Sequence, residues 1–208
     1  MIYILSMEYT LIGKNDLKIS KFALGTWPFA GGELWGNQDD NDSISAVHEC
    51  YENGINFFDT APGYGDGRSE EVLGKAIKNI RNSVVIGTKI PPADLGKNNL
   101  VNSVENSLKR LNTDYIDLMQ IHWPNHDIPI DETAQEIQSL IDSGKINEIG
   151  VSNFGVLDMT DVLNNLNVVT NQLPYNAFWR AIEDDIKPFC IENNIGIICY
   201  STLALSLI

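Results

Sequence analysis

Four residues that can exchange protons stand at or near the ends of apolar stretches of this chain. Asp59 closes the stretch INFFD, Tyr64 follows five positions later, Lys89 lies in VVIGTKI, and His122 lies in YIDLMQIHW. A tyrosine titrates near pH 10, which is too high for free proton exchange at neutral pH. A lysine ammonium about 4 Å away, at an effective dielectric of about 20, would favour the phenolate by roughly 4 kcal/mol, or about three pKa units. The set therefore suits proton donation.

Each partner of the phenol has an expected role in such chemistry. Asp59 would hold Lys89 in its charged form, and His122 would orient a substrate carbonyl or share in the proton transfer. The set supplies a proton for a developing alkoxide but no nucleophile of its own. Taken singly, Asp59 could cap a loop, Lys89 could be a solvated strand end, and His122 could be a core histidine. Their shared position near strand ends favours the catalytic interpretation.

Strand and helix patterns alternate along the chain. YTLI (9–12) and LKIS (17–20), separated by GKND, predict an N-terminal β-hairpin. Apolar runs then predict strands at 22–27, 55–59, 84–90, 115–123, 148–154, 168–175 and 196–202. Amphipathic stripes between them predict helices around 44–51, 72–80, 100–111, 134–141, 157–166 and 182–191, with Ser69 as the N-cap of the second.

This alternation, at about 30 residues per unit, predicts parallel strands joined by right-handed crossovers, either in a doubly wound sheet or in a (β/α)8 barrel. Six consecutive strands carry a polar residue near the C-terminal end, and a barrel gathers those ends around one mouth. The first βα turn, GTWPFAGGELWG, also lacks the G-x-G-x-x-G spacing of dinucleotide-binding sheets. We therefore expect one domain over residues 1–208, an incomplete (β/α)8 TIM barrel with an N-terminal β-hairpin and about seven of eight βα units.

The composition argues against some classes of function. The 208 residues carry a formal net charge of −14, which opposes binding to nucleic acid or to an anionic membrane surface. The opening MIYILSM lacks a basic segment and is too short to span a membrane. Cys50, Cys190 and Cys199 lie in apolar segments without a C-x-x-C spacing, so we expect reduced, buried thiols in a cytoplasmic protein and no metal site.

Nearly the whole chain resembles the aldo-keto reductase superfamily. The matching segments are GTW, GINFFDTAPGYGDGRSEEVLGKAI, VVIGTK, LKRLNTDYIDLMQIHWP, LIDSGKINEIGVSNF and NQLPYNAFWRAIEDDIKPFCIENNIGIICYS. The resemblance implies NADPH-dependent reduction of aldehydes or ketones, with the hydride from the nicotinamide and the proton from Tyr64. Asp59, Lys89 and His122 match the other three positions of the catalytic tetrad.

The resemblance also implies a cofactor site for NADP(H). Ser152, Asn153 and Gln172 should hold the carboxamide of the nicotinamide, and Tyr200 should stack on its ring. The other cofactor-binding residues carried over from the family are Gly25, Thr26, Trp27, Asp59 and Ser201. Trp27, Trp35 and Trp123 are expected to line the pocket mouth, although ordinary packing would also explain them.

The chain ends in GIICYSTLALSLI, directly after the seventh strand. Members of the superfamily continue with a loop over the pyrophosphate, an eighth strand, a basic segment for the 2′-phosphate and a closing helix. We expect unpaired edges on strands one and seven, covered by the tail LALSLI or by self-association, together with weak NADPH binding and impaired activity. A truncated gene product, an engineered fragment, or a second chain supplying the rest would each account for this ending.

Two other functions stay open at this point. Channel β-subunits of the same superfamily suggest a non-catalytic, nicotinamide-nucleotide-sensing binding protein. Lys89 could also serve as the Schiff-base nucleophile of a barrel lyase, although that mechanism gives Tyr64 no role. The sequence indicates a small-molecule carbonyl as the substrate and does not identify it further.

Overall fold

The computed structural model describes residues 6–13, 17–96, 99–204 and 207. It contains one two-stranded antiparallel sheet and one seven-stranded parallel sheet, whose strand order follows the chain from β3 to β9. The hairpin strands are β1 (Tyr9–Ile12) and β2 (Leu17–Ser20). The parallel strands are β3 (Ala23–Gly25), β4 (Phe57–Asp59), β5 (Val85–Ile90), β6 (Ile116–Ile121), β7 (Ile146–Ser152), β8 (Val168–Pro174) and β9 (Gly196–Tyr200).

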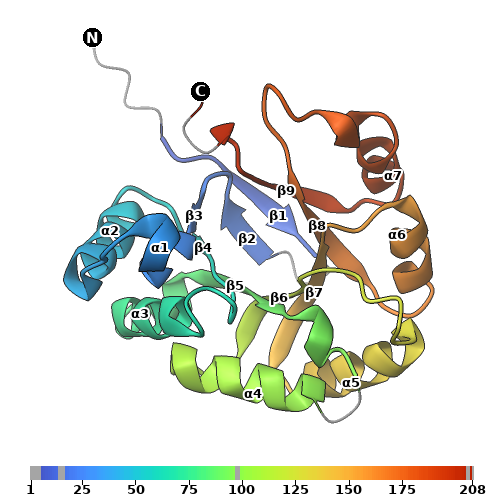
Figure 1. Cartoon of the computed structure of the whole chain (residues 1–208), viewed down its shortest axis with the longest axis horizontal. Helices are drawn as coiled ribbons and strands as arrows, with labels where there is room; N and C mark the ends of the chain where they lie inside the picture. The colour runs from blue at the N-terminus through green and yellow to red at the C-terminus, as the bar shows by residue number, and fades with distance from the viewer. Residues whose placement is uncertain (1–5, 14–16, 97–98, 205–206, 208) are drawn as a thin grey trace.

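Helices lie outside the curled sheet and connect its strands (Figure 1). The α-helices are α1 (Gly32–Trp35), α2 (Asp40–Glu52), α3 (Arg68–Ile77), α4 (Asn99–Leu111), α5 (Ile130–Asp142), α6 (Val156–Leu163) and α7 (Ile186–Glu192). Short 3-10 turns occupy η1 (Trp27–Ala30), η2 (Arg81–Ser83), η3 (Pro92–Asp94) and η4 (Ala181–Glu183). The helices bury the apolar stripes that the sequence shows, because a stripe with a period near 3.6 residues covers one side of a helix.

Side chains of the parallel sheet alternate between two buried layers, as the two-residue period of a strand requires. Outward-facing residues such as Ile86 and Met119 belong to the large cluster beneath the helices. The inward layer forms a smaller cluster of Phe57, Val85, Leu118 and Val169 with Ile12 and Ile19 of the hairpin. The hairpin therefore fills the sheet's interior beside the N-terminal halves of the strands, which leaves the C-terminal halves for polar residues.

These seven strands and the hairpin confirm the predicted architecture, in the form of a curled half-barrel. Among the described residues, β3 and β9 are the two edge strands, and they are less buried than the inner strands β4 to β7. In the tail after β9, Leu203 and Leu207 are 65% and 80% exposed. The described part of the tail thus leaves its apolar side chains largely in solvent, while residues 205, 206 and 208 lie outside the described part.

Two sequence predictions about the fold are wrong. Helix α3 begins at Arg68 with Gly67 as its N-cap, so Ser69 lies inside the first turn, and its hydroxyl contacts Thr26 and Thr60 instead. Cys199 is exposed rather than buried, because it lies on the edge strand β9; Cys190 is buried and Cys50 is half-buried. The hairpin turn at 14–16 and the opening residues 1–5 lie outside the described residues. No helix in the described ranges is both long enough and apolar enough to cross a membrane.

Candidate active site

The register of neighbouring strands sets the positions of the first site residues. Asp59, at the end of β4, lies opposite Gly87 of β5, and Lys89 lies opposite Gln120 of β6. His122 follows β6 directly, and its amide donates to the carbonyl of Ile90 at 3.0 Å. Because parallel strands end at the same side of a sheet, these residues share one end of the half-barrel.

Tyr64 reaches the same end from the turn between β4 and α3. Its amide donates to the Ala61 carbonyl at 3.1 Å, and its carbonyl accepts from the Ser69 amide at 3.2 Å. Its ring lies 5.9 Å from the Trp27 ring, nearly parallel to it, and 6.3 Å from the His122 ring, edge to face. The backbone and two neighbouring rings therefore fix the direction of the phenol.

Lys89 connects the carboxylate to the phenol. Its side chain is 1% exposed, and Nζ donates to Asp59 Oδ2 at 2.8 Å, to the Thr60 carbonyl at 2.8 Å and to Tyr64 Oη at 3.4 Å. These contacts account for all three protons of the ammonium group. The structure thus brings Asp59, Tyr64, Lys89 and His122 together, as the sequence predicts.

The electrostatic balance at Tyr64 differs from the sequence prediction. Burial raises the pKa of the phenol, the Lys89 ammonium lowers it, Asp59 raises it, and the net pKa lies above 10. The prediction of an acidified phenol is therefore wrong for this structure. The reason is that Lys89 lies closer to Asp59 than to Tyr64, so that much of its charge is neutralised, and burial outweighs what remains. The phenol stays protonated at neutral pH.

The other two titrating groups shift in opposite directions. Burial alone would lower the pKa of Lys89, but Asp59 and then Tyr64 oppose it, and the net pKa is raised. Burial lowers the pKa of His122 to about 4, with a further lowering from the Lys89 charge. At neutral pH the site thus holds a charged lysine and an uncharged imidazole. A buried, charged lysine is unsuited to Schiff-base formation, which requires a free amine.

Two glutamine side chains hold the second oxygen of Asp59. Gln120 Nε2 and Gln172 Nε2 both donate to Asp59 Oδ1, at 3.2 and 3.0 Å. The contact uses one of the two Nε2 protons of Gln172, so the second proton and the side-chain oxygen Oε1 are left for a ligand. The sequence interpretation missed Gln120 of β6, although it lies two residues before His122, a spacing that places two side chains on the same face of an extended chain.

The residues expected to hold the nicotinamide form one hydrogen-bonded group. Ser152 Oγ donates to the main-chain carbonyl of Gln172 at 3.0 Å and accepts from Asn153 Nδ2 at 3.0 Å. Asn153 Nδ2 also donates to the His122 carbonyl at 3.1 Å, and its Oδ1 accepts from the Tyr200 hydroxyl at 2.8 Å. Asn153 therefore links the ends of β6, β7 and β9 and fixes the ring of Tyr200.

A cavity of about 730 Å³ opens at this end of the half-barrel. All three predicted tryptophans, Trp27, Trp35 and Trp123, border it. The other predicted site residues that border it are Gly25, Asp59, Tyr64, His122, Ser152, Asn153, Gln172, Tyr200 and Ser201. Lys89 does not border it but contacts Asp59 and Tyr64, which do. Thr26 is fully buried, and its hydroxyl donates to the Asp59 carbonyl at 3.1 Å, so it supports the site from behind.

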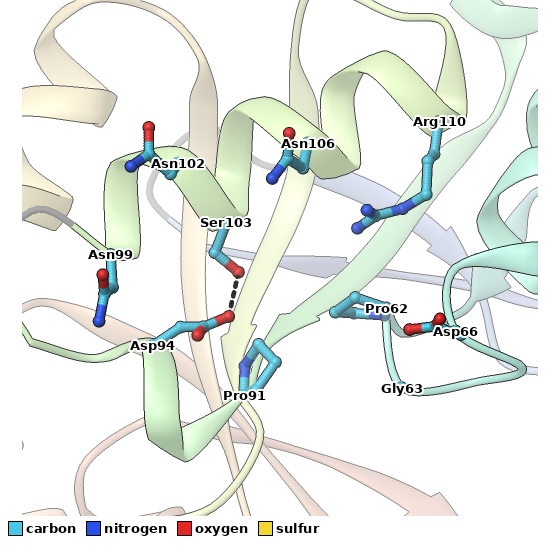
Figure 2. A pocket seen from close by; sticks show the side chains of 10 residues that line it. All are labelled: Pro62, Gly63, Asp66, Pro91, Asp94, Asn99, Asn102, Ser103, Asn106 and Arg110. Carbon is cyan, nitrogen blue, oxygen red and sulfur yellow. Dashed lines mark hydrogen bonds between the residues drawn. The ribbon is translucent and has the colours of Figure 1, made fainter.

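A smaller hollow of about 390 Å³ shares Gly63 with this cavity (Figure 2). One face of α4 supplies most of its polar side chains, and Asp94 accepts a hydrogen bond from Ser103 at 2.8 Å. Arg110, which also borders the hollow, donates to Glu70 at 2.6 Å. No predicted site residue borders this hollow, whereas Asp59, Tyr64 and His122 border the larger cavity.

A curled parallel sheet that gathers polar side chains at the carboxyl ends of its strands is typical of barrel enzymes. The model of the aldo/keto reductase family matches residues 21–208, and the chain belongs to this family. It is 43% identical to the aldo-keto reductase YhdN of Bacillus subtilis (strain 168), over 97% of this chain and 64% of that protein.

Two further proteins illustrate the range of the family. A probable voltage-gated potassium channel subunit beta of Arabidopsis thaliana is 34% identical over 95% of this chain and 64% of its own length. The crystal structure of an aldo-keto reductase from Klebsiella pneumoniae in complex with NADPH superposes with a TM-score of 0.88 and 32% identity, covering 98% of this chain and 69% of that one. The chain thus spans slightly less than two thirds of the length of the two curated relatives.

Proposed function

We propose that this chain reduces aldehyde or ketone carbonyls to alcohols with NADPH, with Tyr64 as the proton donor. The observation that carries the proposal is the contact of Lys89 Nζ with both Asp59 and Tyr64 at the wall of one cavity. Family membership and the NADPH complex of the Klebsiella protein support it.

The residues at the cavity fit the nicotinamide end of the cofactor. The Gln172 side chain offers a carboxamide an acceptor, Oε1, and the second proton of Nε2, and Ser152 Oγ offers a further acceptor. Gly25 borders open space, with no atom beyond its chain neighbours within 4 Å of where a side chain would start. The phosphate end fits less well. No lysine or arginine is among the described residues that border the cavity, although charge-assisted contacts give phosphate groups much of their affinity. We therefore expect weak binding of NADPH.

The protein groups would divide the work of reduction. When bound, the cofactor supplies a hydride to the carbonyl carbon. The Tyr64 hydroxyl gives its proton to the carbonyl oxygen as negative charge develops there, and the raised pKa of Tyr64 keeps that proton in place until then. Lys89, 3.4 Å behind the hydroxyl, stabilises the resulting phenolate. His122, which is neutral at pH 7, holds the substrate oxygen by a hydrogen bond without competing as an acid.

A direct assay tests this proposal. The purified chain is mixed with NADPH and a nitro-substituted benzaldehyde, and the loss of NADPH absorbance is followed. We expect turnover that falls by at least about 100-fold in Tyr64→Phe, with NADPH binding unchanged. Tyr115→Phe is the matched control, because its ring lies beneath Arg81 at the start of β6, away from the cavity, and we expect it to keep wild-type turnover. Equal turnover of the wild type and Tyr64→Phe would contradict the role of the phenol.

The alternative is a non-catalytic, nicotinamide-nucleotide-sensing binding protein. The 34% identity to a probable channel subunit supports it. In that case NADPH would bind without turnover of any aldehyde, and Tyr64→Phe would change neither property. The assay above separates the two functions.

We also propose a cellular compartment and self-association of the chain. The three cysteines are free in the structure, which suits a reducing compartment, and we assign the chain to the cytoplasm. Because β3 and β9 are the two edge strands of the described sheet and Phe22 beside β3 is 70% exposed, we propose that two copies associate through these open edges.

A further inference from the structure

The Asp59 carboxylate is held differently at its two oxygens. Oδ2 accepts from Lys89 at 2.8 Å, whereas Oδ1 accepts from the amides of Gln120 and Gln172. Fixing Oδ1 sets the rotation of the carboxylate and so determines where Oδ2 points. Gln172 also borders the cavity, where a ligand can contact its side chain, whereas Gln120 does not border it. Gln120 is therefore the partner of Oδ1 that no ligand reaches.

Within the described residues, Asp59 alone sets the orientation of the Gln120 amide. Gln120 is 0% exposed and does not border the cavity. Its Oε1 has no hydrogen-bond partner within the described part of the chain, so the bond from Nε2 to Asp59 is what distinguishes one amide orientation from the other. Gly150 of β7 provides the space, because a Cβ there would lie 3.2 Å from Gln120 Cγ and 2.3 Å from Thr170 Oγ1.

We propose that Gln120 is a positioning residue, which keeps the Asp59 carboxylate directed at Lys89 and thereby sets the charge behind the Tyr64 hydroxyl. The inference rests on the proposed carbonyl reduction. Gln120 touches no substrate; it acts through Asp59 and Lys89 on the proton donor. Its loss therefore affects the chemical step and leaves substrate binding unchanged.

The first test is Gln120→Leu, which removes the amide and keeps a side chain of similar size. We expect kcat to fall about tenfold with KM within about twofold, because a hydrogen bond to a charged group is lost. Thr170→Val is the matched control. Thr170 is 1% exposed and lies beside the same Gly150, and its hydroxyl is also unpaired within the described residues. We expect Thr170→Val to keep wild-type kcat; an equal fall in both variants, or none in Gln120→Leu, would overturn the proposal.

The second test is the pH profile of Gln120→Glu. The new carboxyl group would lie beside Asp59 and opposite Lys89 of β5. The other titratable groups at this end are His122, which follows β6, and Tyr64, in the turn between β4 and α3. Glu148 of β7 lies one layer lower, with its carboxylate against Gly13. Two carboxyl groups at one site share a proton, so the protonated glutamic acid donates to Asp59 as the amide does. We expect activity that is retained at low pH and lost as pH rises and the shared proton leaves, while Gln120→Leu shows the same reduction at every pH. A Gln120→Glu profile parallel to the wild type would contradict the proposal.

A readout without substrate separates this inference from the proposed function. Absence of turnover in the wild type would refute the reductase function but not the positioning role. That role is then measured by ¹³C NMR of tyrosine-labelled protein, in which Tyr64→Phe identifies the Tyr64 signal. We expect Gln120→Leu to move the titration midpoint of Tyr64 by at least about half a pH unit relative to the wild type, and Thr170→Val to leave it unchanged. An unmoved midpoint in Gln120→Leu would overturn the positioning role.

Discussion

Replacing Lys89 with methionine tests the buried charge pair at the centre of the site. The side chain of Lys89 is 1% exposed and that of Asp59 is 12% exposed. Methionine keeps the length of the side chain and removes the charge, which leaves Asp59 Oδ2 without the cation 2.8 Å away. Breaking a buried pair from one side costs about 3 to 5 kcal/mol. Because Oδ1 keeps two amide donors and Asp59 borders the cavity, we expect the lower end, about 3 kcal/mol.

Urea unfolding at neutral pH, followed by tryptophan fluorescence, measures the free energy of unfolding of each variant. Asp59→Asn/Lys89→Met removes both charges, and we expect it to recover about 2 kcal/mol relative to Lys89→Met. Lys75→Met is the matched control, because Lys75 pairs with Asp40 at 3.0 Å but is 58% exposed, and it should cost less than about 0.5 kcal/mol. A cost below about 1 kcal/mol for Lys89→Met, or a double variant whose cost equals the sum of the two single variants, would refute the reasoning.

Three further predictions concern His122, the cofactor and the edge strands. The folded-state pKa of His122 lies at about 4, below the ordinary 6.5, so the stability that its neutral ring contributes is complete above pH 6.5 and is lost as pH falls towards 4. In urea unfolding, the free energy of unfolding of His122→Asn should fall by about 1 to 2 kcal/mol less than that of the wild type between pH 7 and pH 4.5, a figure reduced because the ring is partly exposed. An equal fall in both proteins would contradict the lowered pKa. Quenching of tryptophan fluorescence should give binding affinities within about tenfold of one another for NADPH, NADH and reduced nicotinamide mononucleotide, because no lysine or arginine among the described residues borders the cavity to bind a phosphate. Sub-micromolar affinity for NADPH alone would refute this. Sedimentation should show self-association that increases with protein concentration and is weaker in Phe22→Lys. A monomer at all concentrations would contradict association through the edge strands β3 and β9.

Most of the fold follows from local patterns in the sequence. Runs such as VVIGTKI and DLMQI are apolar on both faces, as strands covered by helices on one side and by an interior on the other must be. The N-cap of α3 was not predictable in this way. Gly67 adopts a positive φ of 91° and takes the position before the helix, while Ser69 is drawn into a buried hydroxyl group with Thr26 and Thr60. Which residue caps α3 therefore depends on contacts between distant parts of the chain.

In the site, too, the positions of residues could be predicted from the sequence, but effects of their surroundings could not. Strand ends were enough to predict that Asp59, Lys89 and His122 meet, because parallel strands place their ends together. The direction of the Tyr64 pKa was not predictable, since it depends on how far burial exceeds a lysine charge that Asp59 already neutralises. Gln120 carries no charge and lies inside an apolar strand, so only its two-residue spacing from His122 could have identified it.

The cavity borders both β3 and β9, the first and last strands of the parallel sheet. A molecule bound there contacts both ends of the sheet at once, so its binding opposes their separation during unfolding. By mass action such a ligand raises the melting temperature in proportion to the logarithm of its concentration. The edge strands, which are the least buried part of the sheet, then gain the most protection from amide hydrogen exchange when the cavity is filled.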